Sequence, residues 1–310
     1  MNQRPLLPCA LLLGLAGVGL AQTPTFRAQI DVVRVDVLAT DRGRPIRGLT
    51  AANFELRDNG VAQRIDAIWG ATLPIDVMLV LDASDSVRGL VLEHLKRAAL
   101  ALTESLGAKD RVQLWTFSHR VSLAVAPTSD QDAVRRSVDR MEAGGATALL
   151  DAIYTAFTSR APGPNRSIAL LFSDGKDNRS WLTETEVIDA ARNSETVVYA
   201  VASRPLGLVG PVDNPVSGTG PDEDLLAAIT NGSGGRLLWT TNEQQLRQRF
   251  LDVLEELRSR YVLSYTLGGS PTPGWHAIKV RLKNRTGEVR ARAGYTVAPD
   301  APRQREGSRP

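Results

Sequence analysis

The 310-residue sequence contains one cysteine, Cys9, and only three histidines. Because zinc and iron–sulfur clusters are usually held by thiolates and imidazoles, this shortage argues against either kind of site. Any metal in the protein should therefore be a hard cation held by oxygen ligands. Cys9 lies in the N-terminal leader described below, so the chain that remains without that leader would fold without disulfides.

The sequence also lacks a dense run of basic residues. Its 37 lysines and arginines are scattered among 34 acidic residues, and aromatic residues, at 5%, are not interleaved with them. A nucleic-acid-binding surface normally needs a basic cluster, so we expect a mixed, solvated surface and no nucleic-acid partner. A hydrophobic fraction of 43% is typical of a globular protein, and the length leaves room for about two domains.

Long apolar runs are missing except at the N-terminus. Residues 6–20 are almost wholly apolar, Arg4 is the only charge before Arg27, and small residues surround Ala21. This pattern is typical of a secretory signal peptide over residues 1–21, and it predicts a secreted or periplasmic protein with no stable membrane span. The alternative is a leader retained as a membrane anchor, although the apolar run is short for a span.

Two β-sections lie at the two ends of the remaining chain. Residues 26–70 contain an alternating strand and an Asp58-Asn59-Gly60 hairpin turn, after which residues 61–68 are expected to form the partner strand. Residues 261–297 alternate in the same way. Since an isolated hairpin is marginal in water, we expect these two sections to pair as one divided β-sandwich. The polar, Pro- and Arg-rich tail at 300–310 is expected to be disordered.

Between the β-sections, residues 74–257 alternate apolar strands with helical patterns, of which the first covers residues 87–106. This order predicts an α/β fold, a doubly wound, mostly parallel six-stranded sheet with helices on both faces, inserted in or flanked by the sandwich. Such sheets bind ligands outside the carboxyl ends of their strands. The loop at 205–222 should emerge on that side, either as a functional loop or as a tolerated surface insertion.

Five oxygen-bearing side chains fall at the ends of predicted strands or at the start of a helix. Asp82, Ser84 and Ser86 close the first core strand, and Asp174 closes the strand at 167–172. Thr147 follows a glycine pair and precedes a helix. Because the carboxyl ends of parallel strands lie side by side, we expect these oxygens to converge on a divalent cation. Hydroxyls with a few carboxylates suit Mg²⁺, Mn²⁺ or Ca²⁺.

The order Asp-x-Ser-x-Ser, then Thr, then Asp-Gly resembles the metal-ion-dependent adhesion site (MIDAS) of von Willebrand factor type A domains, over roughly residues 75–257. The resemblance implies that Ser84, Ser86 and Thr147 coordinate the cation, directly or through water, while Asp82 and Asp174 bind it or orient its ligands. It also implies one open coordination position for the Asp or Glu carboxylate of a partner protein. Mg²⁺ is the first expectation, with Mn²⁺ or Ca²⁺ as alternatives.

The flanking β-sections add a narrower resemblance. Residues 53–60, Asn-Phe-Glu-Leu-Arg-Asp-Asn-Gly, and residues 290–295, Arg-Ala-Arg-Ala-Gly-Tyr, are similar to segments of an exported bacterial subgroup with this domain, known mainly from Acidobacteria. The function implied is metal-dependent protein–protein interaction or adhesion.

Three further acids accompany the cluster. We expect Asp85 to point to solvent rather than join the site, and Asp177 to be a turn residue rather than a ligand-orienting acid. Asp151, near the start of a helix, is expected to give structural support.

Two other functions remain as alternatives. One is a scaffold in which the metal only stabilises the fold. The other is a metal-dependent hydrolase with Ser84 as nucleophile, but the sequence has no Gly-x-Ser-x-Gly elbow and no P-loop, and its histidines suggest no triad. We therefore expect a binding protein rather than an enzyme.

Overall fold

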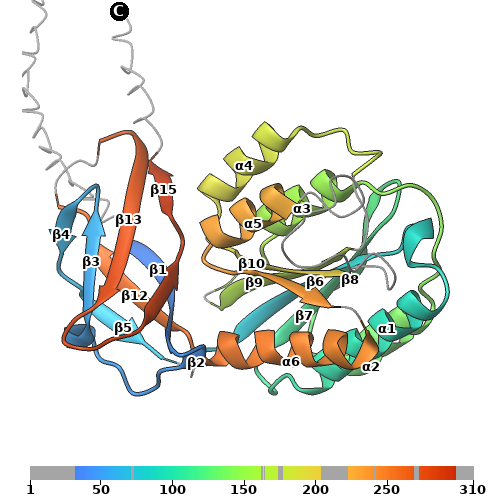
Figure 1. Ribbon diagram of the computed structural model, residues 1–310, viewed down its shortest axis with the longest axis horizontal. Helices are drawn as coiled ribbons and strands as arrows, with labels where there is room; N and C mark the ends of the chain where they lie inside the picture. The colour runs from blue at the N-terminus through green and yellow to red at the C-terminus, as the bar shows by residue number, and fades with distance from the viewer. Residues whose placement is uncertain are drawn as a thin grey trace, which may run out of the picture. The chain divides into compact units, whose positions relative to one another are not determined.

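The computed structural model describes residues 32–70, 73–161, 163, 165–173, 177–203, 223–240, 242–268 and 272–297 (Figure 1). The predicted leader, Asp174, the 205–222 loop and the tail lie outside the described residues. Within the described ranges, no helix is both long and apolar enough to cross a membrane.

A six-stranded sheet forms the centre of the α/β section, in the spatial order β11-β10-β9-β6-β7-β8. All neighbouring strands are parallel except β7 and β8, which are antiparallel. The prediction of a mostly parallel, six-stranded sheet is therefore confirmed. The strands are β6 (Ile75–Asp82), β7 (Arg111–Phe117), β8 (Val121–Thr128), β9 (Arg166–Ser173), β10 (Val197–Ser203) and β11 (Leu237–Thr240).

Helices cover both faces of this sheet because its central strands are apolar on both sides. Leu79 and Leu81 of β6 pack in one core cluster, whereas Met78 and Val80 pack in the other. Helices α1 (Leu90–Glu104), α2 (Gln131–Asp139) and α6 (Glu243–Ser259) bury side chains in the first cluster. Helices α3 (Leu149–Thr158), α4 (Glu184–Asn193) and α5 (Glu223–Gly232) cover the opposite face (Figure 1).

The sheet brings two sequence-distant strand ends together. β6 lies between β7 and β9, and its pairing with β9 runs from Ile75 opposite Arg166 to Leu81 opposite Phe172. The carboxyl ends of β6 and β9 are therefore neighbours, although 91 positions separate Asp82 from Ser173 along the chain. This is the position where the sequence predicts a ligand site.

The predicted pairing between the two ends of the chain is present. β1 (Val32–Asp41) pairs with β12 (Tyr261–Thr266) and with β14 (Glu288–Ala291). In the second sheet, β3 (Phe54–Asp58) pairs with β13 (Gly274–Leu282). The remaining strands are β2 (Arg44–Pro45), β4 (Val61–Gln63), β5 (Ala67–Trp69) and β15 (Gly294–Val297). The two sheets enclose a common core of buried apolar residues.

Two local expectations were wrong. Residues 61–68 do not form one partner strand: β4 pairs with β3, whereas β5 pairs with β12 in the other sheet. A single strand cannot bond to both sheets, so the chain leaves one at Arg64 and enters the other after Asp66. The first helix begins at Leu90 rather than at position 87, because Gly89 has a φ of +81° and separates it from a 3₁₀ turn at Asp85–Val87.

Candidate functional site

Four of the five predicted ligands are described, and they lie on loops at the carboxyl edge of the central sheet. Asp82 is the last residue of β6, and Ser84 lies two positions further along the chain; both residues are 0% exposed. Thr147, just before α3, is 3% exposed, whereas Ser86 is exposed. The placement of Asp174 remains a prediction, since it lies outside the described residues.

The carboxylate of Asp82 is oriented by two neighbouring groups. Its Oδ1 accepts a hydrogen bond from the backbone N–H of Ser84 at 2.8 Å, and its Oδ2 accepts one from the hydroxyl of Ser173 at 2.9 Å. Ser173 is the last residue of β9, so this bond joins the ends of the two adjacent strands. A buried carboxylate held in this way has a fixed direction, which is what a metal site requires.

The hydroxyls of Ser84 and Ser86 converge. Their Oγ atoms lie 2.8 Å apart, because Ser84 has an extended backbone and is followed by the 3₁₀ turn at Asp85–Val87. Adjacent ligands of an octahedral Mg²⁺, each about 2.0–2.1 Å from the metal, lie roughly 2.9 Å apart. The spacing and the all-oxygen character of this pair therefore fit a small hard cation.

Hydrogen bonds to the loop after β9 hold the backbone of Thr147. Its N–H donates to Oδ1 of Asn178 at 2.8 Å, and its carbonyl accepts from the N–H of Asn178 at 3.0 Å. The next residue, Ala148, donates its N–H to the carbonyl of Ser118 at 2.7 Å. Thr147 is thus fixed between two loops that follow β7 and β9.

A pair of backbone bonds joins the Ser84 loop to the Thr147 loop. The N–H of Gly144 donates to the carbonyl of Ala83, and the N–H of Asp85 donates to the carbonyl of Gly145, both at 2.9 Å. Gly145 has a φ of +87°, and a Cβ there would lie 2.8 Å from Nδ1 of His119. Only glycine suits this position, which gives the glycine before the threonine a physical role.

Asp85 fastens the same two loops. Its carboxylate, 60% exposed, accepts a bond from the N–H of Gly145 at 3.1 Å and pairs with Arg88. These bonds, the one from Arg88 first, hold the pKa of Asp85 below its ordinary value. The side chain is exposed as expected, but it also ties the loops together, which the sequence did not indicate.

Asp177 and Asp151 support the start of α3. Asp177 accepts bonds from the N–H groups of Leu149 and Leu150 at 2.8 and 3.3 Å, so it caps a helix from a different loop rather than only making a turn. Asp151 accepts bonds from the N–H groups of Trp181 and Leu182, both at 3.1 Å to Oδ1. Its predicted structural role is confirmed.

The sequence missed Ser173 and Asn178 as supporting residues. Both act through bonds to positions that are 91 and 31 residues away, and their residue types are common at strand ends. Within the described part of the chain, no three His, Cys, Asp or Glu side chains gather as a ligand set. The candidate donors are therefore mainly hydroxyls, and the oxygens of Asp82, Ser84, Ser86 and Thr147 are the groups that would hold a hard cation.

Comparison with known proteins agrees with the fold. The family model of the von Willebrand factor type A domain matches residues 76–248, more than half of the chain. The uncharacterized protein sll0103 of Synechocystis sp. is 26% identical over 189 residues, which are 60% of this chain and 42% of that protein. A UPF0353 protein of Mycolicibacterium vanbaalenii is 24% identical over 224 residues, 65% of this chain and 64% of that protein. The chain thus spans less than two thirds of each relative.

Among solved structures, proximal thread matrix protein 1 from the mussel byssus, determined with a zinc-occupied MIDAS motif, has a TM-score of 0.52 to this chain. The match covers 66% of this chain and 50% of that one at 17% sequence identity. At this identity the likeness concerns the fold.

Proposed function

Since the chain belongs to the von Willebrand factor type A domain family, we propose that it holds a divalent cation at Asp82, Ser84, Ser86, Thr147 and Asp174 and uses it to dock a partner protein. The partner would offer an Asp or Glu carboxylate to an open coordination position. Few protein carboxylates neutralise such a cation, so its residual positive charge favours an anionic ligand. Mg²⁺ is the expected ion, and Mn²⁺, Ca²⁺ and Zn²⁺ belong in the same test.

One observation carries the proposal: a fully buried carboxylate, Asp82, stands beside two hydroxyl oxygens that are 2.8 Å apart, at the meeting ends of β6 and β9. The zinc-occupied MIDAS motif of the mussel protein supports the idea that this fold holds a divalent cation. The bonds between the backbone of Thr147 and Asn178, which fix Thr147 in the loop before α3, support its inclusion in the site.

The surroundings of the site suit protein docking. Trp181, 86% exposed, lies in the loop that also bonds to Thr147 through Asn178. Tryptophans are common anchors in protein interfaces. A partner carboxylate bound to the cation would fix the orientation of the partner protein. An apolar contact to Trp181 would add to the binding affinity.

Two measurements on the full chain and on Asp82→Asn test this function, with Asp41→Asn as the control at an exposed position of β1. We expect Mg²⁺ to raise the thermal midpoint of the wild type and the control but not of Asp82→Asn. We also expect partner capture from the producing cells to be lost with chelator and in Asp82→Asn. If stabilisation is lost while capture persists, the metal serves only the fold and the docking proposal fails.

We further propose that the chain is exported through its N-terminal leader and acts by binding rather than by catalysis. N-terminal sequencing of the protein recovered outside the cytoplasm should begin after Ala21; an uncleaved leader would contradict this. A panel of phosphoesters should show no metal-dependent turnover, and turnover that disappears in Ser84→Ala would overturn the non-catalytic role.

A further inference from the structure

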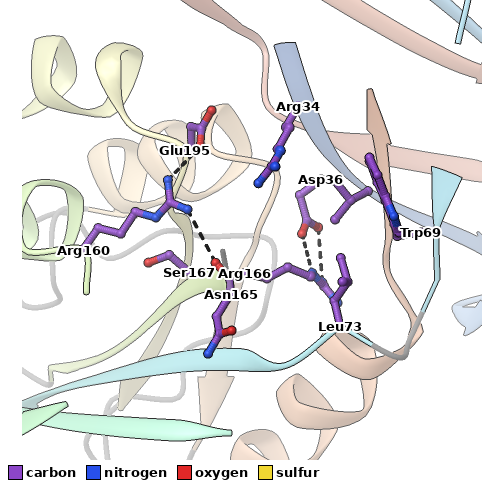
Figure 2. Close-up of a pocket in the computed structure, with 10 residues that line it drawn as sticks. Arg34, Asp36, Trp69, Leu73, Arg160, Asn165, Arg166, Ser167 and Glu195 are labelled. Atoms are coloured by element: carbon purple, nitrogen blue, oxygen red, sulfur yellow. Dashed lines mark hydrogen bonds and ion pairs between the residues drawn. The ribbon is translucent and has the colours of Figure 1, made fainter. Parts of the chain in front are cut away.

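A pocket lies at the opposite end of β9 from the candidate cation site. Its volume is about 210 Å³, and residues from both the β-sandwich and the α/β section line it (Figure 2). Arg34 of β1 and Trp69 of β5 come from the sandwich, whereas Arg160 and Arg166 come from the α/β section. The eight residues of β9 place this pocket roughly 23 Å from the Ser173 end.

Guanidinium groups outnumber carboxylates around this pocket. Arg34, Arg160 and Arg166 line it together with Asp36 and Glu195. The guanidinium of Arg166 is already bonded within the protein. The side chain is 4% exposed, and it donates to Asp36 at 2.8 Å and to the carbonyl of Leu257 at 2.8 Å. Asp36 accepts a further bond from the buried Arg260, so the charge of this carboxylate is already matched.

The other two arginines keep part of their surface for a ligand. Arg160 pairs with Glu195 at 2.8 Å and donates to the carbonyls of Gly163 and Asn165 at 3.4 and 3.5 Å, while its side chain stays 34% exposed. In the part of the chain that the structure describes, the guanidinium of Arg34 makes no hydrogen bond or ion pair. The guanidinium ends of Arg34 and Arg160 point toward the same space in Figure 2. Two cations that line one pocket, with a carboxylate paired to only one of them, would be stabilised by an added anion.

The uncharged part of the lining combines three apolar residues, Trp69, Leu73 and Val262, with the polar residues Asn165 and Ser167. Trp69 is 38% exposed, and it lines the pocket together with Leu73 (Figure 2). A flat indole face can hold a planar apolar group, and a guanidinium fork matches a carboxylate in two parallel bonds. Pockets for drug-sized ligands measure about 300–1,000 Å³, so a cavity of this volume takes a smaller molecule.

We propose that this pocket binds a small organic carboxylate with a planar apolar body. The carboxylate lies between Arg34 and Arg160, and the apolar body rests against Trp69 and Leu73. Such a ligand touches both the sandwich and the α/β section. The pocket is independent of the cation site, so neither proposal depends on the other.

Titration calorimetry of the full chain with benzoate tests this site, with benzamide and inorganic phosphate as comparison ligands. We expect saturable benzoate binding that Arg34→Ala weakens about tenfold or more, because a charged hydrogen-bonding group is lost. Arg44→Ala removes an exposed arginine of the neighbouring strand β2 and should leave the affinity unchanged. Benzamide and phosphate should each bind at least tenfold more weakly than benzoate.

Several results would overturn the proposal. No saturable benzoate binding, or equal binding by the wild type and Arg34→Ala, would show that the arginines do not form the site. Equal binding of benzamide would remove the role of the charge, and equal or tighter binding of phosphate would remove the role of the apolar wall.

Discussion

A carboxylate lies at each end of β9, the partly buried Asp36 of β1 and the buried Asp82 of β6, and their chemical settings are opposite. At the Arg166 end, Asp36 accepts bonds from the guanidinium groups of Arg166 and Arg260. At the Ser173 end, Asp82 accepts bonds from the hydroxyl of Ser173 and the backbone N–H of Ser84, both neutral donors. At Asp36, two guanidinium groups neutralise the carboxylate, and these ion pairs join the sandwich to the α/β section. The setting of Asp82 gathers oxygens and suits a cation supplied from solution.

The largest effect should follow from breaking the charged joint. Asp36→Asn leaves the buried guanidinium groups of Arg166 and Arg260 without their carboxylate, so we expect the free energy of unfolding to fall by about 3–5 kcal/mol. Urea denaturation of the wild type, Asp36→Asn and the exposed control Asp41→Asn measures this. A loss no larger than that of the control would show that the joint does not hold the two sections together.

The same joint should also respond to acid. Burial acts to raise the pKa of Asp36, but Arg166 and Arg260 outweigh it and hold the pKa below its ordinary value. The stabilisation is therefore present above the carboxyl's unfolded pKa and is lost as the pH falls through the lower folded pKa. Asp36→Asn should unfold with a weaker pH dependence in that acidic range.

Next in size is the loss of cation-dependent stability at the other end of β9. At a Mg²⁺ concentration about 100 times the dissociation constant, binding should add about 2.7 kcal/mol to the free energy of unfolding. Asp82→Asn should abolish this increment, whereas Asp36→Asn should keep it despite its lower stability. If both variants lose the increment equally, the two ends of β9 are not the separate sites described above.

Asp58, a buried carboxylate in the sandwich, differs from both because one of its partners is a histidine. It accepts bonds from the hydroxyls of Tyr265 and Tyr295 at 2.7 and 2.8 Å and lies 2.8 Å from Nδ1 of His276. Nε2 of His276 lies 2.8 Å from the carbonyl of Thr272. Both ring nitrogens therefore face acceptors, which favours the protonated imidazolium.

This arrangement sets a pH dependence of opposite sign to that of Asp36. Burial acts to lower the pKa of His276, but the bonds to Thr272 and Asp58 outweigh it and raise the pKa. The stabilisation is complete below the unfolded pKa of about 6.5 and is lost as the pH rises through the higher folded pKa.

The matching variant is His276→Gln. It should lower the free energy of unfolding at pH 5 by about 1–3 kcal/mol and have a smaller effect at alkaline pH. His94→Gln on α1 is the matched control. An equal cost for His276→Gln at both pH values would mean that the ring is neutral in the fold.

The smallest effect concerns α3, the helix that begins two residues after Thr147. Asp177→Ala removes the acceptor for two N–H groups of α3 and should cost about 1 kcal/mol of stability. Asp177→Asn keeps one oxygen acceptor and should recover a large part of this loss. Identical unfolding curves for Asp177→Ala and the wild type would show that the cap does not stabilise α3.

The sequence predicted the central sheet well because its signal is local. The continuous apolar run of β6, followed directly by Asp82, Ser84 and Ser86, indicates a buried strand and its functional end in one short segment. The pairing of the chain ends was predictable because each β-section alone is too small to be stable.

Long-range partners could not be predicted in the same way. Asp36 meets Arg166 and Arg260 across 130 and 224 positions, and nothing in the local pattern of β1 distinguishes this aspartate from its neighbours. Residues 61–68 looked like one strand because alternation continues through them, whereas the competition between two sheets divides them. Asn178 is likewise recognisable only once the loops are placed beside each other.

A cation held at the carboxyl ends of β6 and β9 would be located by anomalous diffraction from crystals of the full chain soaked in Mn²⁺. We expect an anomalous peak within about 2.0–2.4 Å of the Oγ atoms of Ser84 and Ser86, and no such peak in Asp82→Asn crystals. A Mn²⁺ peak elsewhere with none beside these two hydroxyls would contradict this expectation.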